Sequence, residues 1–194
     1  MNELFVTEVA LDRAALRRAG GYLNRLPCLR ELEALAFYRP VTYFVGENGT
    51  GKSTLLEGLA AALGLNPEGG GRHFQRAESF YNLASEVDRL EEIGDPGLFD
   101  SYGGRSLHDQ SHGEAFLSLV LNRFTPRGLY LLDEPEAALS PSRQLALLRQ
   151  LHLLAGEGSQ FIIATHPPLL MALPGAAILS FEEGGAIRPT AYQE

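Results

Sequence analysis

A glycine-rich run at residues 46–54 has the residue types and the spacing to bind phosphate groups. The run is Gly-Glu-Asn-Gly-Thr-Gly-Lys-Ser-Thr, which matches the pattern Gly-x-x-x-x-Gly-Lys-Ser. Its three glycines let the backbone turn tightly and point successive N–H groups into a concave anion site. We expect Lys52 to reach the β- and γ-phosphates of a nucleotide, and the Ser53 hydroxyl to be a ligand of Mg²⁺. The residues assigned to phosphate binding are Gly46, Glu47, Asn48, Gly49, Thr50, Gly51, Lys52, Ser53 and Thr54.

The segments on either side of this loop have the character that a phosphate site requires. Residues 41–45 are a short apolar, β-branched and aromatic run, typical of a buried parallel strand. Residues 52–63 are rich in Leu, Ala and Glu, and Gly64 stands where a helix C-cap is expected. The order strand, loop, helix places the positive end of the helix dipole at the phosphates. We therefore interpret the run as a phosphate-binding loop and not as an ordinary glycine-rich turn.

Two acids stand at the end of a second hydrophobic run, residues 128–133. Ligands of open α/β sheets bind at the carboxyl ends of strands, so Asp133 is expected to hold Mg²⁺ through its water shell, opposite Ser53. Glu134 is then aimed at the γ-phosphate, where it can orient and deprotonate the attacking water. The competing interpretation is a pair of exposed acids that merely precede Pro135.

Taken together, these motifs resemble those of the ATP-binding-cassette (ABC) ATPases. Residues 133–136, Asp-Glu-Pro-Glu, resemble the Walker B segment of that family, and residues 136–140 follow where the family has its D-loop. Thr165 and His166 resemble the H-loop, whose histidine contacts the γ-phosphate, so the resemblance assigns His166 a catalytic role beside Glu134 and Lys52. Within the family, the chain is similar to small stand-alone bacterial ATPases related to the chromosome-maintenance and DNA-repair branch.

A five-residue segment resembles the diagnostic signature of the family. Residues 110–114, Gln-Ser-His-Gly-Glu, match Leu-Ser-Gly-Gly-Gln at Ser111 and Gly113. The resemblance implies that these two residues contact an ATP held by a second subunit, so that two molecules clamp two nucleotides. His112 and Glu114 depart from the pattern. Glutamate at the last position occurs in chromosome-maintenance and DNA-repair members, whereas His112 weakens the match to transporter subunits.

The resemblance also implies a Q-loop, which links Mg²⁺ and the attacking water to a helical subdomain. We assign Gln75 to this role and to the metal site, with Glu78 as the alternative. Tyr22 is an aromatic residue upstream of the phosphate-binding loop, and we expect it to pack in the core and not to stack on a nucleotide base.

The order of the motifs predicts one α/β domain over residues 1–194, with the P-loop NTPase fold. We expect a mainly parallel central sheet, antiparallel N-terminal β elements and an inserted helical subdomain. The nucleotide-binding core is assigned to residues 1–71 and 125–194, and the helical subdomain with the signature to residues 72–124. The other expected elements are strands at 4–11, 29–37 and 160–165, helices at 12–19, 79–92, 114–123 and 140–156, and a hairpin of 178–181 and 186–188.

Composition restricts the partners and the compartment. Sixteen basic and 24 acidic residues give a net charge of -8, which argues against a surface devoted to nucleic acid but leaves a local basic patch open. The single Cys28 provides no disulfide framework and fits a reducing cytosol. No apolar stretch approaches the ~20 residues of a membrane span. We expect a cytoplasmic protein that reaches a membrane only through a partner.

The leading hypothesis is Mg²⁺-dependent ATP hydrolysis by an ATPase that forms an ATP-dependent homodimer and drives or regulates an unidentified protein partner. One alternative is the nucleotide-binding subunit of an ABC transporter. Another is an ATP-sensing module that does not hydrolyse, although the presence of Glu134 speaks against it. A P-loop kinase or GTPase lacks support, because the guanine-binding motif Asn-Lys-x-Asp is missing from the sequence.

Overall fold

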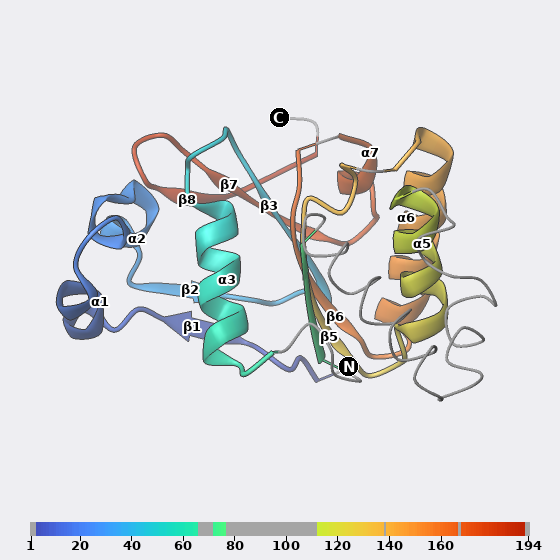
Figure 1. Ribbon diagram of the computed structural model, residues 1–194, viewed down its shortest axis with the longest axis horizontal. Coiled ribbons are helices and arrows are strands. Elements are labelled where there is room, and N and C mark those ends of the chain that lie inside the picture. The colour runs from blue at the N-terminus through green and yellow to red at the C-terminus, as the bar shows by residue number, and fades with distance from the viewer. Residues whose placement is uncertain (1–2, 66–71, 77–111, 138, 167, 193–194) are drawn as a thin grey trace, which may run out of the picture.

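A computed structural model describes residues 3–65, 72–76, 112–137, 139–166 and 168–192. Its main feature is a six-stranded sheet with the strand order β4-β5-β6-β3-β7-β8 (Figure 1). The strands up to β7 pair in parallel, and β8 runs antiparallel to β7. The expected mainly parallel α/β fold is therefore confirmed. The strand bounds are β3 (Val41–Val45), β4 (Arg72–Arg76), β5 (Leu129–Asp133), β6 (Gln160–Ala164), β7 (Ala177–Phe181) and β8 (Ile187–Thr190).

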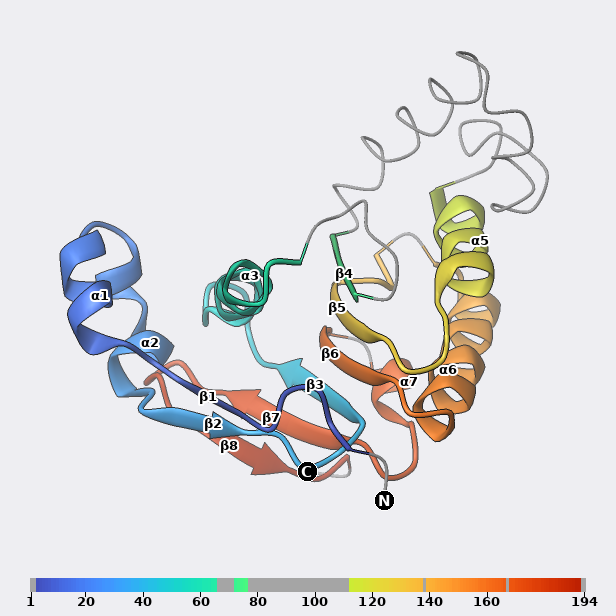
Figure 2. The ribbon, with the colours of Figure 1, turned by 90° about the horizontal axis from the view of Figure 1, so that it is seen from below.

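Helices cover both faces of this sheet, with α3 on one face and α5, α6 and α7 on the other (Figure 2). Side chains that alternate along β5 explain the two layers. Leu129 and Leu131 are buried with the leucines of α3, whereas Tyr130 and Leu132 are buried with residues of α5 and α6. Each face of the sheet thus has its own hydrophobic core. The helix bounds are α3 (Lys52–Ala62), α5 (His112–Arg123), α6 (Pro141–Gly156) and α7 (Pro168–Met171).

The N-terminal elements form a separate antiparallel sheet in which β1 (Glu8–Ala10) pairs with β2 (Ala34–Ala36). The helix expected at 12–19 is present: Asp12 caps it by accepting the N–H groups of Ala14 and Ala15, each at 2.9 Å. The helical elements between the two strands are α1 (Arg13–Ala19), the 3-10 turn η1 (Leu23–Arg25) and α2 (Pro27–Glu31).

The structure corrects the expected strand at 29–37. Residues up to Glu31 belong to α2, which begins with Pro27, and only three residues pair as β2. Leu29, Leu32 and Leu35 are all buried, and their three-residue spacing is closer to the period of a helix than to the alternation of a strand. The strand expected at 4–11 is likewise confined to β1.

Tyr22 is 62% exposed, so its expected core packing is wrong, whereas Cys28 is buried as expected.

The segment assigned to the helical subdomain begins with a strand. Residues 72–76 form β4, which pairs along its whole length with β5 at the edge of the sheet. Edge strands have one unpaired side and tolerate polar residues, which explains why polar composition did not indicate a strand here. The helix expected at 114–123 is confirmed as α5. The helix expected at 79–92 lies outside the described residues, and the division into core and subdomain stays a prediction.

Candidate nucleotide-binding site

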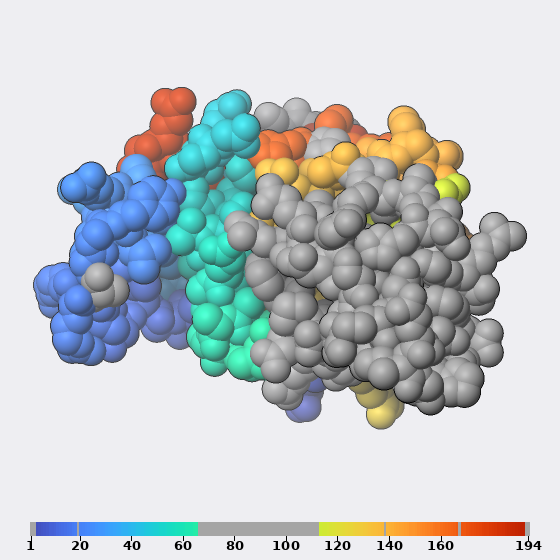
Figure 3. Space-filling view, viewed as in Figure 1, coloured from blue at the N-terminus to red at the C-terminus, as the bar shows by residue number. Residues whose placement is uncertain are grey.

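The glycine-rich loop leaves β3 at Val45 and enters α3 at Lys52, at the upper edge of the face shown in Figure 3. Two of its glycines are required by close packing. Gly46 and Gly51 have φ values of 136° and 99°. A Cβ atom would lie 2.4 Å from the carbonyl oxygen of Phe181 at Gly46, and 2.3 Å from the Sγ atom of Cys28 at Gly51. The loop conformation is therefore held from β7 on one side and from α2 on the other.

Lys52 lies under the loop and is only 5% exposed. Its ammonium group donates hydrogen bonds to the carbonyl oxygens of Gly46 at 2.7 Å and Glu47 at 2.9 Å. Burial lowers the pKa of Lys52, and the negative charges of Glu134 and Asp133 offset part of this shift. A cation held in this way at the first turn of a helix is suited to contact the phosphates of a nucleotide.

Ser53 and Asp133 meet although 80 positions separate them in the chain. The Ser53 hydroxyl donates a hydrogen bond of 2.9 Å to the carboxylate of Asp133. The sheet brings them together, because Asp133 pairs with Ala164 on β6 and Ala164 pairs with Phe44 on β3, so the carboxyl ends of three strands coincide. The predicted juxtaposition of these two residues is thus present.

The pair fits the oxygen ligands that Mg²⁺ prefers. In the described parts of the chain, no group of three or more His, Cys, Asp or Glu side chains is placed to hold a metal ion. Mg²⁺ usually takes one or two protein ligands and fills its shell with water and phosphate oxygens, so a hydroxyl and a carboxylate suffice. Ser53 and Asp133 are therefore the residues that would hold the ion.

Glu134 and His166 lie side by side at the same edge of the sheet. The Nε2 atom of His166 is 3.3 Å from Oε1 of Glu134, and both side chains are partly exposed. The backbone at Glu134 is left-handed, with φ of 49°, and its N–H donates to the carbonyl of Ala164 at 2.9 Å. Left-handed backbone is uncommon outside glycine and is found at functional sites, where the surrounding structure holds it.

The structure adds one residue to which sequence reasoning assigned no role. Glu136 is 8% exposed, and its Oε1 atom accepts a hydrogen bond of 3.0 Å from the backbone N–H of His166. In the sequence, the available signals were a third acid directly after Pro135 and its place in the segment that resembles Walker B. Nothing in that spacing points to a contact 30 residues further along the chain.

The remaining predicted site residues lie at the margins of the described structure. The backbone of Gln75 pairs with Leu132 on β5, one position before Asp133, so the residue lies beside the strand end that carries the metal-site acid. Gly113 is buried in the first turn of α5, across the sheet from α3. Ser111 lies outside the described residues. The roles assigned to these three residues stay predictions.

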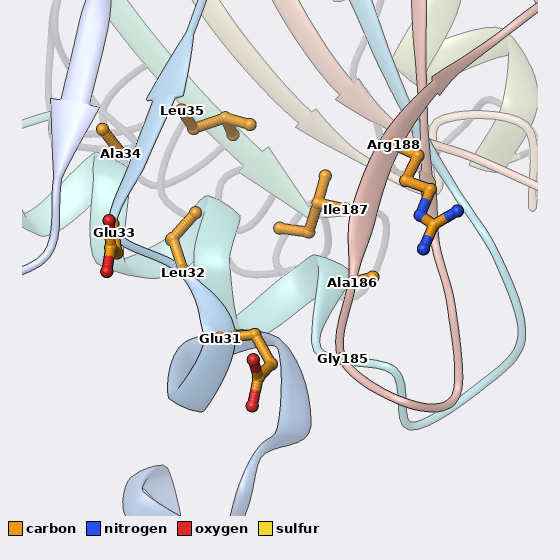
Figure 4. Close-up of a pocket in the computed structure, with 9 residues that line it drawn as sticks. All are labelled: Glu31, Leu32, Glu33, Ala34, Leu35, Gly185, Ala186, Ile187 and Arg188. Atoms are coloured by element: carbon orange, nitrogen blue, oxygen red, sulfur yellow. The ribbon is translucent and has the colours of Figure 1, made fainter.

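A groove of about 400 Å³ lies apart from this site, between β2 and the β7–β8 hairpin (Figure 4). Leu32 and Leu35 on one wall and Ile187 on the other point into it, and Arg188 points away. The groove is lined by none of the residues predicted to bind phosphate or metal. It is therefore not the nucleotide site, although its wall α2 also supplies the cysteine that packs on Gly51.

Comparisons with known proteins agree with this arrangement. A family model described as an AAA domain matches residues 22–114, and a second, described as an AAA domain of candidate AbiEii toxins of type IV toxin–antitoxin systems, matches residues 99–172. The thiamine import ATP-binding protein ThiQ of Cereibacter sphaeroides is 30% identical over 64% of this chain and 69% of its own length. The chain belongs to the ABC-type P-loop ATPases. Members of this family bind and hydrolyse ATP.

Another relative of this ABC-type ATPase is described as an ABC transporter ATP-binding protein, from Streptomyces avermitilis. It is 28% identical over 86% of the chain, and the chain spans 36% of its length.

Solved structures show that the fold is shared. An inward-facing ABC transporter of metal-chelate type gives a TM-score of 0.57 at 17% identity, with 84% of this chain and 76% of that chain covered. A dimeric bacterial ABC transporter cassette gives a TM-score of 0.55 at 16% identity, with 83% of this chain and 89% of that chain covered. The SMC head domain of Thermotoga maritima gives a TM-score of 0.52 at 16% identity, with 81% of this chain and 93% of that chain covered. No helix in the described parts of this ABC-type ATPase has the length and apolar character needed to cross a membrane.

Proposed function

We propose that this ABC-type ATPase hydrolyses Mg-ATP and that two copies close around two nucleotides to drive or regulate a protein partner. The observation that carries the proposal is the hydrogen bond between Ser53 and Asp133. Lys52 lies beneath the same loop, and Glu134 directly follows Asp133 in the chain. These side chains supply what phosphoryl transfer from ATP to water requires, which is charge stabilisation and a positioned base.

Each side chain has a distinct task in this proposal. Lys52 and the loop N–H groups bind the β- and γ-phosphates. Ser53 and Asp133 hold Mg²⁺, which supplies positive charge to the phosphate oxygens when it is bound. Glu134 accepts a proton from the attacking water, and His166, 3.3 Å from that carboxylate, would contact the γ-phosphate.

The homodimer rests on the resemblance of residues 110–114 to the ABC signature and on the dimeric form of a cassette with the same fold. In this arrangement Ser111 and Gly113 of one copy complete the γ-phosphate site of the other. The partner of the dimer is a protein, and any work at a membrane is done through that partner.

The names of both relatives favour a second candidate, a nucleotide-binding subunit of an ABC transporter. This candidate shares the chemistry and differs in the partner, which would be a membrane protein. A third candidate, an ATP-sensing interaction module, differs in the chemistry, because it would bind ATP and release no phosphate.

The first test is the mass in solution of the Glu134→Gln variant, measured by light scattering after gel filtration with and without Mg-ATP. Loss of the base should slow hydrolysis by roughly 10²–10⁴-fold and trap an ATP-bound dimer. The matched control is Lys52→Ala in the Glu134→Gln background, which should bind ATP weakly and stay monomeric. Phosphate release by the unmodified protein separates the ATPase from the sensor.

An Mg-ATP-dependent dimer of Glu134→Gln that is lost in the Lys52→Ala double variant supports the proposal. A monomer that binds ATP and never pairs refutes the homodimer. Normal ATP affinity in Lys52→Ala refutes the phosphate-binding role of the loop.

A further inference from the structure

Glu136 is a buried acid that no step of the proposed hydrolysis uses. It lies on the turn that follows β5, in which the N–H of Ala137 donates to Glu134 and the N–H of Leu139 donates to Glu136, at 3.0 and 2.8 Å. Glu134 begins this turn with a partly exposed side chain, whereas Glu136 is buried. The turn therefore presents one acid to the site and buries the other.

The buried carboxyl group holds the main chain of the second catalytic residue. Strand β6 ends at Ala164, and the last hydrogen bond to strand β3 comes from the next residue: the N–H of Thr165 donates to the carbonyl of Phe44 at 3.1 Å. The next N–H along the chain belongs to His166, and it donates to Oε1 of Glu136 at 3.0 Å. The contact lies where the sheet no longer fixes the backbone, directly at the residue whose ring faces Glu134.

This carboxyl group is costly to bury. Its Oε2 atom has no hydrogen-bond partner of normal geometry among the described residues, although the neighbouring Thr165 hydroxyl also acts to lower the pKa of this acid. Burial raises the pKa of Glu136, and hydrogen bonding from His166 counteracts the rise only in part. An apolar side chain of the same volume would avoid this cost. A structural role alone therefore does not account for an acid at this position.

We infer that Glu136 is a positioning residue: its carboxyl group fixes the backbone of His166 so that the imidazole ring stands against Glu134 at the γ-phosphate site. The inference rests on the proposed hydrolysis. It makes the turn after β5 and the loop after β6 one unit, in which the two catalytic side chains keep their mutual distance of 3.3 Å.

The test compares Glu136→Gln with Glu136→Met. Glutamine keeps an oxygen that accepts the N–H of His166, whereas methionine keeps the volume and lacks that acceptor. We expect Glu136→Gln to retain kcat within about threefold, and Glu136→Met to lose roughly ten- to a hundredfold in kcat with the KM for ATP nearly unchanged, because the phosphate-binding loop is intact. Thermal melting of both variants shows whether they are folded.

Two further measurements separate positioning from a general defect. In a His166→Ala background, Glu136→Met should lower kcat by less than about twofold, because the group it positions is gone. In the nucleotide-free protein, the NMR resonances of the His166 amide and ring, assigned by their loss in His166→Ala, should move in Glu136→Met and stay in place in Glu136→Gln.

The inference is overturned if Glu136→Met keeps full kcat, or if Glu136→Met lowers kcat by the same factor in the His166→Ala background as in the unmodified protein. It is also overturned if the His166 resonances do not move in Glu136→Met. Because the NMR measurement needs no turnover, it tests the positioning role even if the unmodified protein releases no phosphate. That last result would refute the proposed hydrolysis instead.

Discussion

At the scale of the residue, three energetically unfavourable features lie around the proposed site. Lys52 is an ammonium group held under a loop, Glu134 has left-handed backbone, and Glu136 is an acid with a buried, unpartnered oxygen in the described structure. Each of these costs folding free energy, and all three lie at or beside the place where phosphate chemistry is proposed. Their location indicates that the cost is retained for function.

Glu136 should make the stability of the protein depend on pH. Its pKa is raised by burial above the ordinary 4.5, so the folded state holds this proton more tightly than the unfolded state. The resulting stabilisation is complete below pH 4.5 and is lost as the pH rises through the raised value, at up to about 1.4 kcal/mol per pH unit. Glu136→Gln has no such proton. In urea unfolding from pH 4 to pH 8, the unmodified protein should lose stability relative to this variant as the pH rises, and parallel curves would contradict the prediction.

At the scale of the element, local patterns identify the strands and helices that carry the motifs and miss the connections between them. Residues 41–45 and 52–62 form β3 and α3 as expected, because a short apolar, β-branched run is typical of a buried strand and a run rich in Leu and Ala that ends before a glycine is typical of a helix. The Gln160 side chain does something that no pattern indicates. Its amide donates to the carbonyl of Val6 at 2.8 Å and accepts the Val6 N–H at 2.9 Å. The side chain thus makes the two backbone hydrogen bonds that a neighbouring strand would otherwise make with the N-terminal segment.

Gln160→Leu should therefore destabilise the protein without affecting ATP affinity. It leaves the N–H and the carbonyl of Val6 without their buried partner, at a cost of about 3 kcal/mol in the free energy of unfolding. Nucleotide binding should be unchanged, because Gln160 begins β6 and the site lies at the other end of that strand. Urea unfolding measures the loss, and faster hydrogen exchange at Val6 locates it. Gln150→Leu on α6 is the control and should cost far less.

At the scale of the whole molecule, the described chain provides one half of the proposed catalytic unit. The phosphate-binding loop, Asp133, Glu134 and His166 share one edge of the sheet, whereas α5 begins on the opposite face from α3. Gly113 lies in the first turn of that helix, and Ser111 stands two positions before Gly113 in the sequence. The proposed homodimer resolves the separation, because in it the signature of one copy acts on the nucleotide of the other.

Ser111→Arg should block that dimer. In the Glu134→Gln background, the long side chain would occupy the space of the γ-phosphate of the partner, and the dimer dissociation constant should rise at least about tenfold, equivalent to ~1.4 kcal/mol. ATP binding to the monomer should be unchanged. Asn122→Arg, with the same charge on an exposed position of α5, is the matched control. Light scattering with Mg-ATP gives the result, and dimers that survive Ser111→Arg would rule out the proposed role of the signature.

The sequence by itself determined the family of this protein and predicted which residues meet at the proposed nucleotide site. Lys52, Ser53, Asp133 and Glu134 were identified from spacing and strand ends, because a phosphate-binding loop is a local backbone structure and parallel strands all present their carboxyl ends at one edge. The tertiary structure alone decided that Glu136 holds His166, that Cys28 packs on Gly51 and that Gln160 binds Val6. These contacts join residues 23 to 154 positions apart through the way the layers pack, and a single sequence has periodicity within an element but carries no record of which elements touch.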